Sequence, residues 1–351
     1  MARKKKKLTK GQIRRVRSNQ NRRLQSNKEV QWDESLLENP QEGIVITRFG
    51  QHADIEDMET HKIYRCNLRR SIGSLVSGDR VVWRQGKEVL AGISGVVEAI
   101  HERKSVLTRP DYFEGVKAVA ANINQMVIVS AVMPELSLNL IDRYLIASYQ
   151  TKIPVLLVLN KIDLLDKQSL FLVKKRLDIY VDLGYPLIYV STQTQEGMTQ
   201  LENALKDKMN VFVGQSGVGK SSLVNALMPE LGIETGIISE NSGLGQHTTT
   251  ATRLYHFAHG GDLIDSPGIR EFGLWHLSAQ EVTESFIEFQ DYIGHCKFRD
   301  CKHLDDPGCA VRQAVDDGHI SRARFESYHH IIDGMLEGKD KRQFSKDKTK
   351  F

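Results

Sequence analysis

The sequence predicts a multidomain α/β protein built from three successive parts, and three observations indicate this fold class. Short alternating runs separated by glycines fill residues 42–106, as in a small β-barrel. Near-continuous apolar runs then alternate with helical spacing, as in a doubly wound parallel sheet. From about residue 278 the spacing becomes helical again, and this region carries a cluster of cysteines and a histidine.

The composition is that of a soluble globular protein, with 40% hydrophobic and 26% charged residues among 351. No apolar run approaches the roughly 20 residues of a membrane helix, and no apolar stretch follows the basic N-terminus as in a secretory signal. Four cysteines, three of them clustered, indicate a reducing compartment and a metal site instead of disulfides. We therefore expect a cytoplasmic protein without a membrane partner, and a monomer by default.

A basic arm is expected over residues 1–38, without fixed structure on its own. Residues 1–28 contain twelve lysines and arginines and no acid, so the rest of the chain carries 36 basic and 44 acidic residues. This asymmetry favours a nucleic acid as partner, with a solubilising tail as the alternative. No apolar face accompanies the charges, which disfavours a membrane surface. A second basic tail is expected over residues 339–351.

The first folded domain is predicted over residues 39–108. Its strand candidates are residues 43–48, 62–66, 79–84 and 95–100. Four or five short strands favour a closed barrel of the OB-fold type, although other small β-domains fit the same pattern. Cys66 is expected to pack there as a small apolar side chain.

The predicted α/β domain covers residues 109–277, starting at the break formed by Arg109 and Pro110. A helix at 138–149 lies between two of its strands, which gives a βαβ unit. Its predicted strands are residues 125–130, 153–159, 187–190 and 210–213. A doubly wound sheet of this kind binds ligands at the carboxyl ends of its strands.

A phosphate-binding loop, G-x-x-x-x-G-K-[ST], is matched by G-Q-S-G-V-G-K-S at residues 214–221. A predicted strand enters the loop and a predicted helix leaves it, which argues against a chance glycine-rich turn. Lys220 is expected to bridge the β- and γ-phosphates, and the Ser221 hydroxyl to bind Mg²⁺. The expected nucleotide-binding residues here are Gly214, Gln215, Ser216, Gly217, Val218, Gly219, Lys220, Ser221 and Ser222.

A guanine signature, N-K-x-D, directly follows the predicted strand 153–159. The Asp163 carboxylate would accept from the N1–H and exocyclic amine of guanine, which adenine cannot offer. Asn160 would reach the O6/N7 side, and the Lys161 stem would lie along the loop and the base. Ser191, after another predicted strand, fits the supporting guanine loop loosely.

A D-x-P-G motif begins at Asp265, and a threonine triplet precedes it. Asp265 is expected to hold Mg²⁺ through water, and the Gly268 N–H to sense the γ-phosphate. A switch threonine would close over Mg²⁺, with Thr249 or Thr250 preferred; an exposed turn is the alternative for the triplet alone.

The order of these motifs is rotated relative to Ras-type GTPases, in which the phosphate loop comes first and N-K-x-D last. Here N-K-x-D comes first, at residue 160, and D-x-P-G last, at residue 265. Because domain termini lie close together, one sheet can be closed by a new link, here residues 193–209, and reopened elsewhere. The sequence thus predicts a circularly permuted P-loop GTPase domain that leads from its switch directly into the C-terminal region.

A metal site is predicted from Cys296, Cys301, His303 and Cys309. Three thiolates and one imidazole suit a single tetrahedral Zn²⁺, and a complete set of four ligands indicates a structural ion. Unrelated buried cysteines are the alternative. We expect a mostly helical zinc-binding domain over residues 278–338.

These motifs in this order, with a barrel before and a Cys/His element after them, resemble the RsgA (YjeQ) family of small-ribosomal-subunit biogenesis GTPases. The resemblance covers nearly the whole chain and includes the G-Q-H-T-T-T segment at residues 245–250. It implies an OB-fold front domain, a zinc-binding rear domain and a role in late 30S maturation. It further implies GTP hydrolysis stimulated by the 30S subunit, with 16S rRNA as a partner.

Hydrolysis is expected to be slow without a partner, since Ile269 stands where Ras-like enzymes place a water-orienting glutamine. The resemblance favours His247 for this role. A group from the ribosome, or simple packing of His247 in its loop, are the alternatives. The chain lacks the lipidation motif expected of a membrane-traffic GTPase. An RNA-binding, GTP-dependent switch acting outside ribosome assembly also fits the residues.

Overall fold

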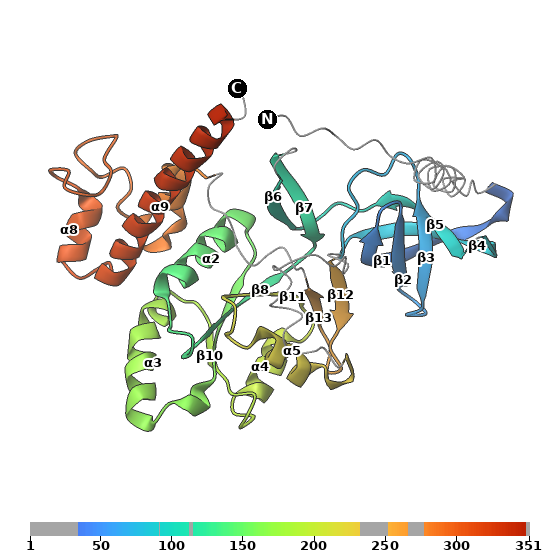
Figure 1. The fold of residues 1–351 in the computed structure, drawn as a ribbon, viewed down its shortest axis with the longest axis horizontal. Coiled ribbons are helices and arrows are strands. Elements are labelled where there is room, and N and C mark those ends of the chain that lie inside the picture. Colours follow the sequence, from blue (N-terminus) through green and yellow to red (C-terminus); the bar gives the residue numbers. More distant parts are fainter. Residues whose placement is uncertain (1–33, 91, 112–114, 232–251, 266–276, 349–351) are drawn as a thin grey trace, which may run out of the picture.

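The computed structural model describes residues 34–90, 92–111, 115–231, 252–265 and 277–348, with the backbone alone at 109–111, 115–116, 231 and 336–348. Figure 1 shows a β-barrel, an α/β sheet with its helices, and a mostly helical C-terminal part in succession. None of the helices within these residues combines the length and the apolarity needed to cross a membrane. Most of the predicted basic arm, residues 1–33, lies outside the described residues.

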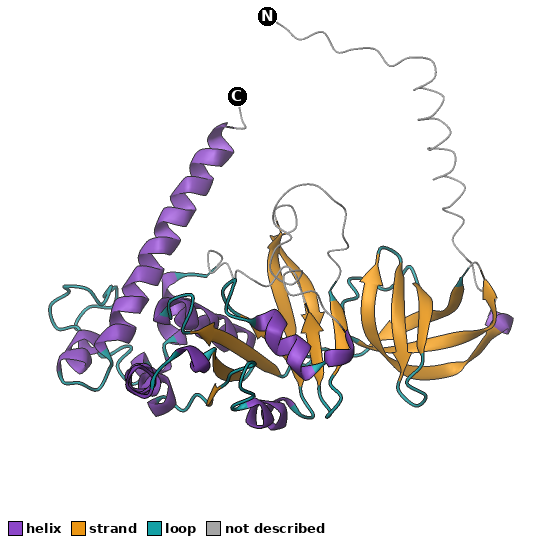
Figure 2. Cartoon of the chain, turned by 60° about the horizontal axis from the view of Figure 1, so that its bottom comes forward, coloured by secondary structure: helices purple, strands orange, loops and turns teal. Residues whose placement is uncertain are grey.

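Five strands form the barrel after a short 3₁₀ turn, η1 (Glu34–Leu36): β1 (Leu37–Phe49), β2 (His52–Asp57), β3 (Ile63–Leu68), β4 (Arg80–Leu90) and β5 (Ile93–Ile100). Their order is β1-β2-β3-β5-β4, and β4 pairs back with β1. Figure 2 shows the barrel of strands at the right-hand end of the view. This closed order is that of an OB-fold, so the predicted barrel is confirmed. Val45, Ile55, Trp83 and Cys66 are buried inside it. Burial raises the pKa of the Cys66 thiol, which packs as an apolar side chain as expected.

Strand β2 is missing from the sequence-based prediction. The alternation of side chains expected of a strand is present, since Ala53 and Ile55 are fully buried. However, Glu56 and Asp57 belong to residue types that are depleted in strands. Both carboxylates are buried with partners: Asp57 accepts from the turn that follows it, and Glu56 pairs with His256. These contacts outweigh the local propensity.

A two-stranded hairpin, β6 (Val106–Asp111) and β7 (Gly115–Ala121), connects the barrel to the α/β sheet. The predicted break at Arg109 and Pro110 is wrong as a break in structure, because both residues lie within β6. A two-stranded ribbon has two open edges, so a proline without an N–H can be tolerated there.

The α/β sheet contains β8 (Gln125–Ala131), β9 (Val155–Asn160), β10 (Leu187–Tyr189), β11 (Met209–Val213), β12 (Arg253–His256) and β13 (Asp262–Asp265). Their order is β10-β9-β8-β11-β13-β12, with all neighbours parallel except β12 and β13. The helices around the sheet are α2 (Leu138–Thr151), α3 (Lys167–Asp182), α4 (Met198–Leu205) and α5 (Lys220–Leu227), with 3₁₀ turns η2 (Ile162–Leu164) and η3 (Pro229–Leu231). The predicted strands and the predicted helix correspond to β8, β9, β10, β11 and α2.

Both faces of this sheet are covered by helices. Met126 and Ile128 of β8 pack with α2 and α3, whereas Val127 and Val129 pack with α4 and α5. All four side chains are at most 1% exposed. Burial on both faces explains why the strands read as continuous apolar runs, and it confirms the doubly wound fold.

The barrel and the α/β sheet are joined through main-chain pairing. Strand β12 pairs antiparallel with β1, with Thr47 opposite Arg253. Eleven strands therefore form one continuous sheet, and β12 lies at the junction (Figure 1).

The C-terminal part contains α7 (Ala279–Ser285), η5 (Ile287–Phe289), α8 (Ala310–Asp316) and α9 (Arg322–Lys348). Its core includes Phe286, Phe289 and Tyr328, and Ile146 of α2 packs into the same cluster. The mostly helical prediction is confirmed. Helix α9 continues through residues 338 and 339, where the sequence suggested a boundary between domain and tail.

A buried ion cluster attaches α9 to the α/β domain. Arg324 donates to Asp142 of α2 at 2.5 Å and to Glu288 at 2.7 Å. Its side chain is 2% exposed, and that of Asp142 is fully buried. Tyr180 of α3 also donates to Asp142, at 2.7 Å.

Candidate nucleotide site and metal centre

The predicted nucleotide motifs meet at the carboxyl edge of the parallel strands. Strand β9 ends at Asn160, β11 at Val213 and β13 at Asp265. Because β9, β8, β11 and β13 are neighbours in that order, the loops that follow them lie at one edge. This edge is where open α/β sheets bind ligands. The motifs therefore form a single site even though their order along the chain differs from that of Ras-type GTPases.

The phosphate loop is a tight turn between β11 and α5. Gly214, Gly217 and Gly219 have φ values of +145°, +82° and +91°. A Cβ at Gly214 would lie 2.1 Å from the carbonyl oxygen of Val129, and one at Gly219 would lie 2.4 Å from Nδ2 of Asn160. Glycine is therefore required at both positions. A turn of this kind directly before a helix is the backbone arrangement that binds phosphate groups.

Lys220 and Ser221 begin α5 and are buried, with 8% and 9% exposed. Nζ of Lys220 donates to the carbonyls of Gly214 and Gln215, both at 2.7 Å. Its positive charge is thus held over the turn that the glycines form. Among the other predicted loop residues, Gln215, Ser216 and Gly217 are exposed, Val218 is buried and Ser222 is half-buried.

Two side chains of the guanine loop bind the phosphate loop. Asn160, 1% exposed, donates from Nδ2 to the carbonyl of Val218 at 3.0 Å and accepts from the Lys161 N–H at 2.8 Å. Lys161 donates from Nζ to the carbonyls of Gly217 and Met133, at 2.6 and 2.8 Å. Met133 was not predicted, because a main-chain acceptor leaves no side-chain signal in a sequence. The two loops are joined even without a ligand.

Ser191 orients the Asp163 carboxylate. Its Oγ donates to Oδ1 of Asp163 at 2.6 Å and accepts from the N–H groups of Gln193 and Thr194 at 3.2 and 3.1 Å. Ser191 is fully buried, whereas Asp163 is exposed. The second carboxylate oxygen of Asp163 can therefore accept hydrogen bonds from a base.

Asp265 is half-buried at the end of β13, opposite Arg253 of β12. The residues expected to complete this side of the site lie outside the described residues: His247, Thr248, Thr249, Thr250, Ser266, Pro267, Gly268, Ile269 and Arg270. Their assigned roles stay predictions.

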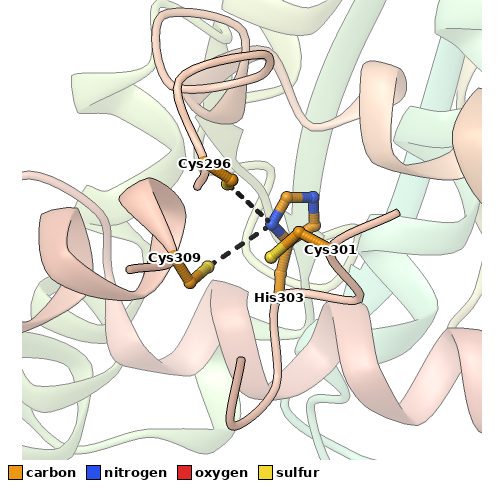
Figure 3. Close-up of side chains that lie close together, drawn as sticks. All are labelled: Cys296, Cys301, His303 and Cys309. Carbon is orange, nitrogen blue, oxygen red and sulfur yellow. Dashed lines mark hydrogen bonds between the residues drawn. The ribbon is translucent and has the colours of Figure 1, made fainter. Parts of the chain in front are cut away.

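The four predicted metal ligands lie together in the C-terminal part (Figure 3). The donor atoms of Cys296, Cys301, His303 and Cys309 all lie within 4.8 Å of one another. Nδ1 of His303 is 3.6 Å from Sγ of Cys296 and 3.5 Å from Sγ of Cys309. Bonds of about 2.0–2.3 Å to one tetrahedral ion would bring four donors this close, so the set fits a single metal ion.

The surroundings of the cluster suit a metal. The N–H groups of Ala310 and Arg312 donate to Sγ of Cys296 and Cys309, both at 3.4 Å. Burial raises the pKa of Cys309, and the hydrogen bond from Arg312 offsets part of this effect. Burial lowers the pKa of His303, which keeps its imidazole neutral and able to bind a cation. The cluster is consistent with zinc.

A family model described as RsgA GTPase matches residues 100–275. The chain belongs to the RsgA GTPase family. "Small ribosomal subunit biogenesis GTPase RsgA 1" of Vibrio parahaemolyticus is 64% identical over 348 residues, which cover 98% of each chain. "Small ribosomal subunit biogenesis GTPase RsgA" of Dickeya dadantii is 58% identical over 344 residues, covering 97% of this chain and 98% of that protein.

Two solved structures extend the relationship to the fold. YjeQ from Thermotoga maritima, at 34% identity, has a TM-score of 0.69 over 85% of this chain and 99% of its own. YloQ, described as a circularly permuted GTPase, is 28% identical, with a TM-score of 0.67 over 89% of this chain and 99% of its own. The resemblance to the RsgA family and the permuted GTPase fold are therefore confirmed. As an RsgA GTPase, the chain is a GTP hydrolase, which implies Mg²⁺ with the nucleotide.

Permutation has a direct structural result in this RsgA GTPase. The next described element after β13 is α7, and residues 266–278 lie between them. Among the described residues, no strand of the GTPase sheet comes between Asp265 and the metal-binding part.

Proposed function

We propose that this RsgA GTPase hydrolyses GTP on the 30S ribosomal subunit during its late maturation, and that the subunit stimulates hydrolysis. The names and near-complete coverage of its relatives support this partner. The structural observation that carries the nucleotide assignment is the pair of hydrogen bonds from Asn160 and Lys161 to the phosphate loop. They join the guanine-reading and phosphate-binding parts into one site.

Each part of that site has a chemical role. Asp163, held by Ser191, accepts the N1–H and amine hydrogens of guanine, and Asn160 and Lys161 support the base. The phosphate loop wraps the β-phosphate, with Lys220 between the β- and γ-phosphates. The magnesium ligands of the protein are the Ser221 hydroxyl, Asp265 through water, and Thr249 or Thr250. Gly268 donates its N–H to the γ-phosphate.

Slow hydrolysis in the free protein follows from Ile269, which cannot orient a water molecule. We assign that task to His247 once the subunit is bound, and a ribosomal group is the competing source. The proposal predicts that GTP binding and hydrolysis respond differently to changes at His247.

The Cys₃His cluster is assigned one structural Zn²⁺. Four protein ligands leave no open coordination position, so the ion supplies folding energy and no catalysis. It would fix the segment between Cys296 and Cys309 against α8 and α9. The full ligand set is Cys296, Cys301, His303 and Cys309.

Three basic regions and the barrel are assigned to 16S rRNA. OB-folds bind nucleic acids, and Lys297, Arg299 and Lys302 are exposed between the metal ligands. The predicted arm and tail, residues 1–38 and 339–351, add further positive charge. Phosphate contacts of this kind release counterions, so binding is expected to weaken steeply with salt. With a ribosomal partner, the protein would act in the cytoplasm, and we propose that it acts as a monomer.

The test is the steady-state rate of GTP hydrolysis alone, with 30S subunits, and with 50S subunits as a control. Stimulation of about 10-fold or more by 30S and not by 50S is expected, within the range that supplied catalytic groups provide. His247→Ala is expected to bind GTP normally and to lose the stimulation. Equal rates with and without 30S would refute the proposal, whereas stimulated turnover in His247→Ala would assign the water to a ribosomal group.

A further inference from the structure

Two hydroxyl groups of the barrel donate to a single main-chain carbonyl of the GTPase domain. Oγ1 of Thr47 lies 2.9 Å from the carbonyl oxygen of Thr252, and Oγ of Ser77 lies 2.8 Å from the same oxygen. Thr47 is 3% exposed and Ser77 is 2% exposed. A carbonyl oxygen has two lone pairs, so the barrel can satisfy both.

The acceptor lies beside the magnesium side of the proposed site. Thr252 directly precedes β12, and its neighbour Arg253 is paired with Asp265 on one side and with Thr47 on the other. The Thr252 carbonyl therefore lies at the end of the β12–β13 hairpin that carries Asp265. A shift of this carbonyl would move the backbone next to Asp265.

The loop that carries Ser77 is itself fixed. Nε of Arg103 donates to the fully buried carboxylate of Asp79 at 2.7 Å. Gly78 has a φ of +86°, and a Cβ there would lie 2.9 Å from Cδ1 of Ile264. The loop backbone therefore packs directly against the residue that precedes Asp265 in β13.

A second contact holds the other end of the same hairpin. His256 of β12 binds Glu56 of the barrel from Nε2 at 2.8 Å and Asp262 of β13 from Nδ1 at 2.6 Å. Glu56 is 5% exposed. The barrel thus holds the β12–β13 hairpin at both ends, with uncharged hydroxyl donors at the end near the nucleotide.

We propose that Thr47 and Ser77 are positioning residues for GTP hydrolysis, which act through the Thr252 carbonyl to hold Asp265 in place. The inference rests on the magnesium role proposed for Asp265. It makes the barrel a part of the catalytic geometry in addition to its RNA-binding role. Guanine and diphosphate binding depend on the loops after β9 and β11, which these hydroxyls do not contact.

The test is intrinsic, single-turnover GTP hydrolysis by Thr47→Val combined with Ser77→Ala, measured across a magnesium titration. The rate at saturating magnesium is expected to fall about 10-fold, since small misplacements of catalytic groups cost this much or more. The magnesium concentration for half-maximal rate is expected to rise by about the same factor. GDP affinity without magnesium is expected to stay within about twofold of that of the natural protein. General unfolding would instead lower GDP affinity together with the rate.

Two matched variants separate positioning from folding. Thr47→Ser keeps a hydroxyl at position 47 and leaves Ser77 unchanged, so both donors to the Thr252 carbonyl remain. This variant is expected to retain the rate and magnesium requirement of the natural protein. Ser148→Ala removes a buried hydroxyl that donates to the Ile153 carbonyl at 2.6 Å, away from the barrel, and is expected to leave the magnesium requirement unchanged.

Asp265→Asn, measured in parallel, distinguishes the inference from the proposal beneath it. An unchanged magnesium requirement in Asp265→Asn would remove Asp265 from the proposed site. An unchanged rate and magnesium requirement in the Thr47→Val, Ser77→Ala double variant would overturn the inference, whatever Asp265→Asn shows. The inference is supported if the double variant needs more magnesium than the natural protein and Thr47→Ser does not.

Discussion

Ser191 holds Asp163 by one short hydrogen bond, 2.6 Å from Oγ to Oδ1, between residues 28 positions apart. The bond joins the loops that follow β9 and β10, two neighbouring strands of the sheet. Ser191 is buried and its own oxygen accepts two main-chain N–H groups, so the carboxylate is oriented before a base arrives. Such preorganisation removes part of the entropy cost of binding.

Loss of this bond should weaken nucleotide binding. We expect Ser191→Ala to raise the Kd for GDP about 10-fold, because hydrogen bonds to charged groups contribute about 1.5–3 kcal/mol. Titration with a fluorescent GDP analogue measures the effect. Thr192→Ala is the neighbouring control and should change Kd less than twofold by the same reasoning. Equal Kd values for Ser191→Ala and the natural protein would show that Asp163 needs no such support.

The buried cluster between α2 and α9 should dominate the attachment of the C-terminal part. We expect Arg324→Met to lower the free energy of unfolding by about 3–5 kcal/mol, since Asp142 and Glu288 would stay buried without their cationic partner. Arg322→Met is the control, because its pair with Asp316 is exposed and should contribute less than about 1 kcal/mol. Urea unfolding measures both. Equal losses in the two variants would contradict the importance of the buried cluster.

The contact at His256 should make stability depend on pH. Hydrogen bonds that His256 donates to Asp262 and Glu56 raise its pKa to about 9, above its ordinary 6.5. Protonated His256 therefore stabilises the folded protein fully below about pH 6.5, and this contribution is lost as pH rises through about 9. The side chain is half exposed, so we expect only about 1 kcal/mol.

Comparison with His256→Gln isolates this contribution from other titrating groups. The difference in unfolding free energy between the two proteins should be larger at about pH 6 than at about pH 10. A difference that does not change between these two conditions would contradict the assignment.

Removal of one metal ligand should release the ion. We expect Cys301→Ser to lose the single bound zinc and to lower the melting temperature by about 5 °C or more. Cys66→Ala, in the barrel core, should keep its zinc even where it lowers stability. Metal analysis of the two purified variants checks this. One zinc per chain retained by Cys301→Ser would rule out the proposed ligand set.

The sequence predicts the sites well where chemistry demands particular residue types. Glycine at Gly214 and Gly219 is imposed by close approach of neighbouring atoms, so the phosphate loop has a recognisable pattern. The Cys/His spacing is equally restrictive, because four donors must meet at one point. Apolar runs likewise predict the parallel strands, since these are buried on both faces.

Other features leave little trace in the sequence. The Thr252 carbonyl and the Met133 carbonyl are main-chain acceptors, which any residue supplies. Arg324 and Asp142 are 182 residues apart, and nothing local identifies them as partners. Strand β2 is not predicted because its acidic residues are of types depleted in strands, and the contact of Glu56 with the distant His256 leaves no local signal.

Whether the rotated motifs form one guanine-reading site is tested most directly by exchanging the base specificity. Asparagine at position 163 would offer an N–H to the carbonyl that xanthine has in place of the guanine amine. Hydrolysis rates of GTP and XTP are measured for the natural protein and for Asp163→Asn at equal enzyme concentrations. The natural protein should prefer GTP, and Asp163→Asn should prefer XTP, a reversal of at least about 100-fold in the rate ratio. An Asp163→Asn variant that still prefers GTP would contradict the assignment of residues 160–163 as the base-reading loop.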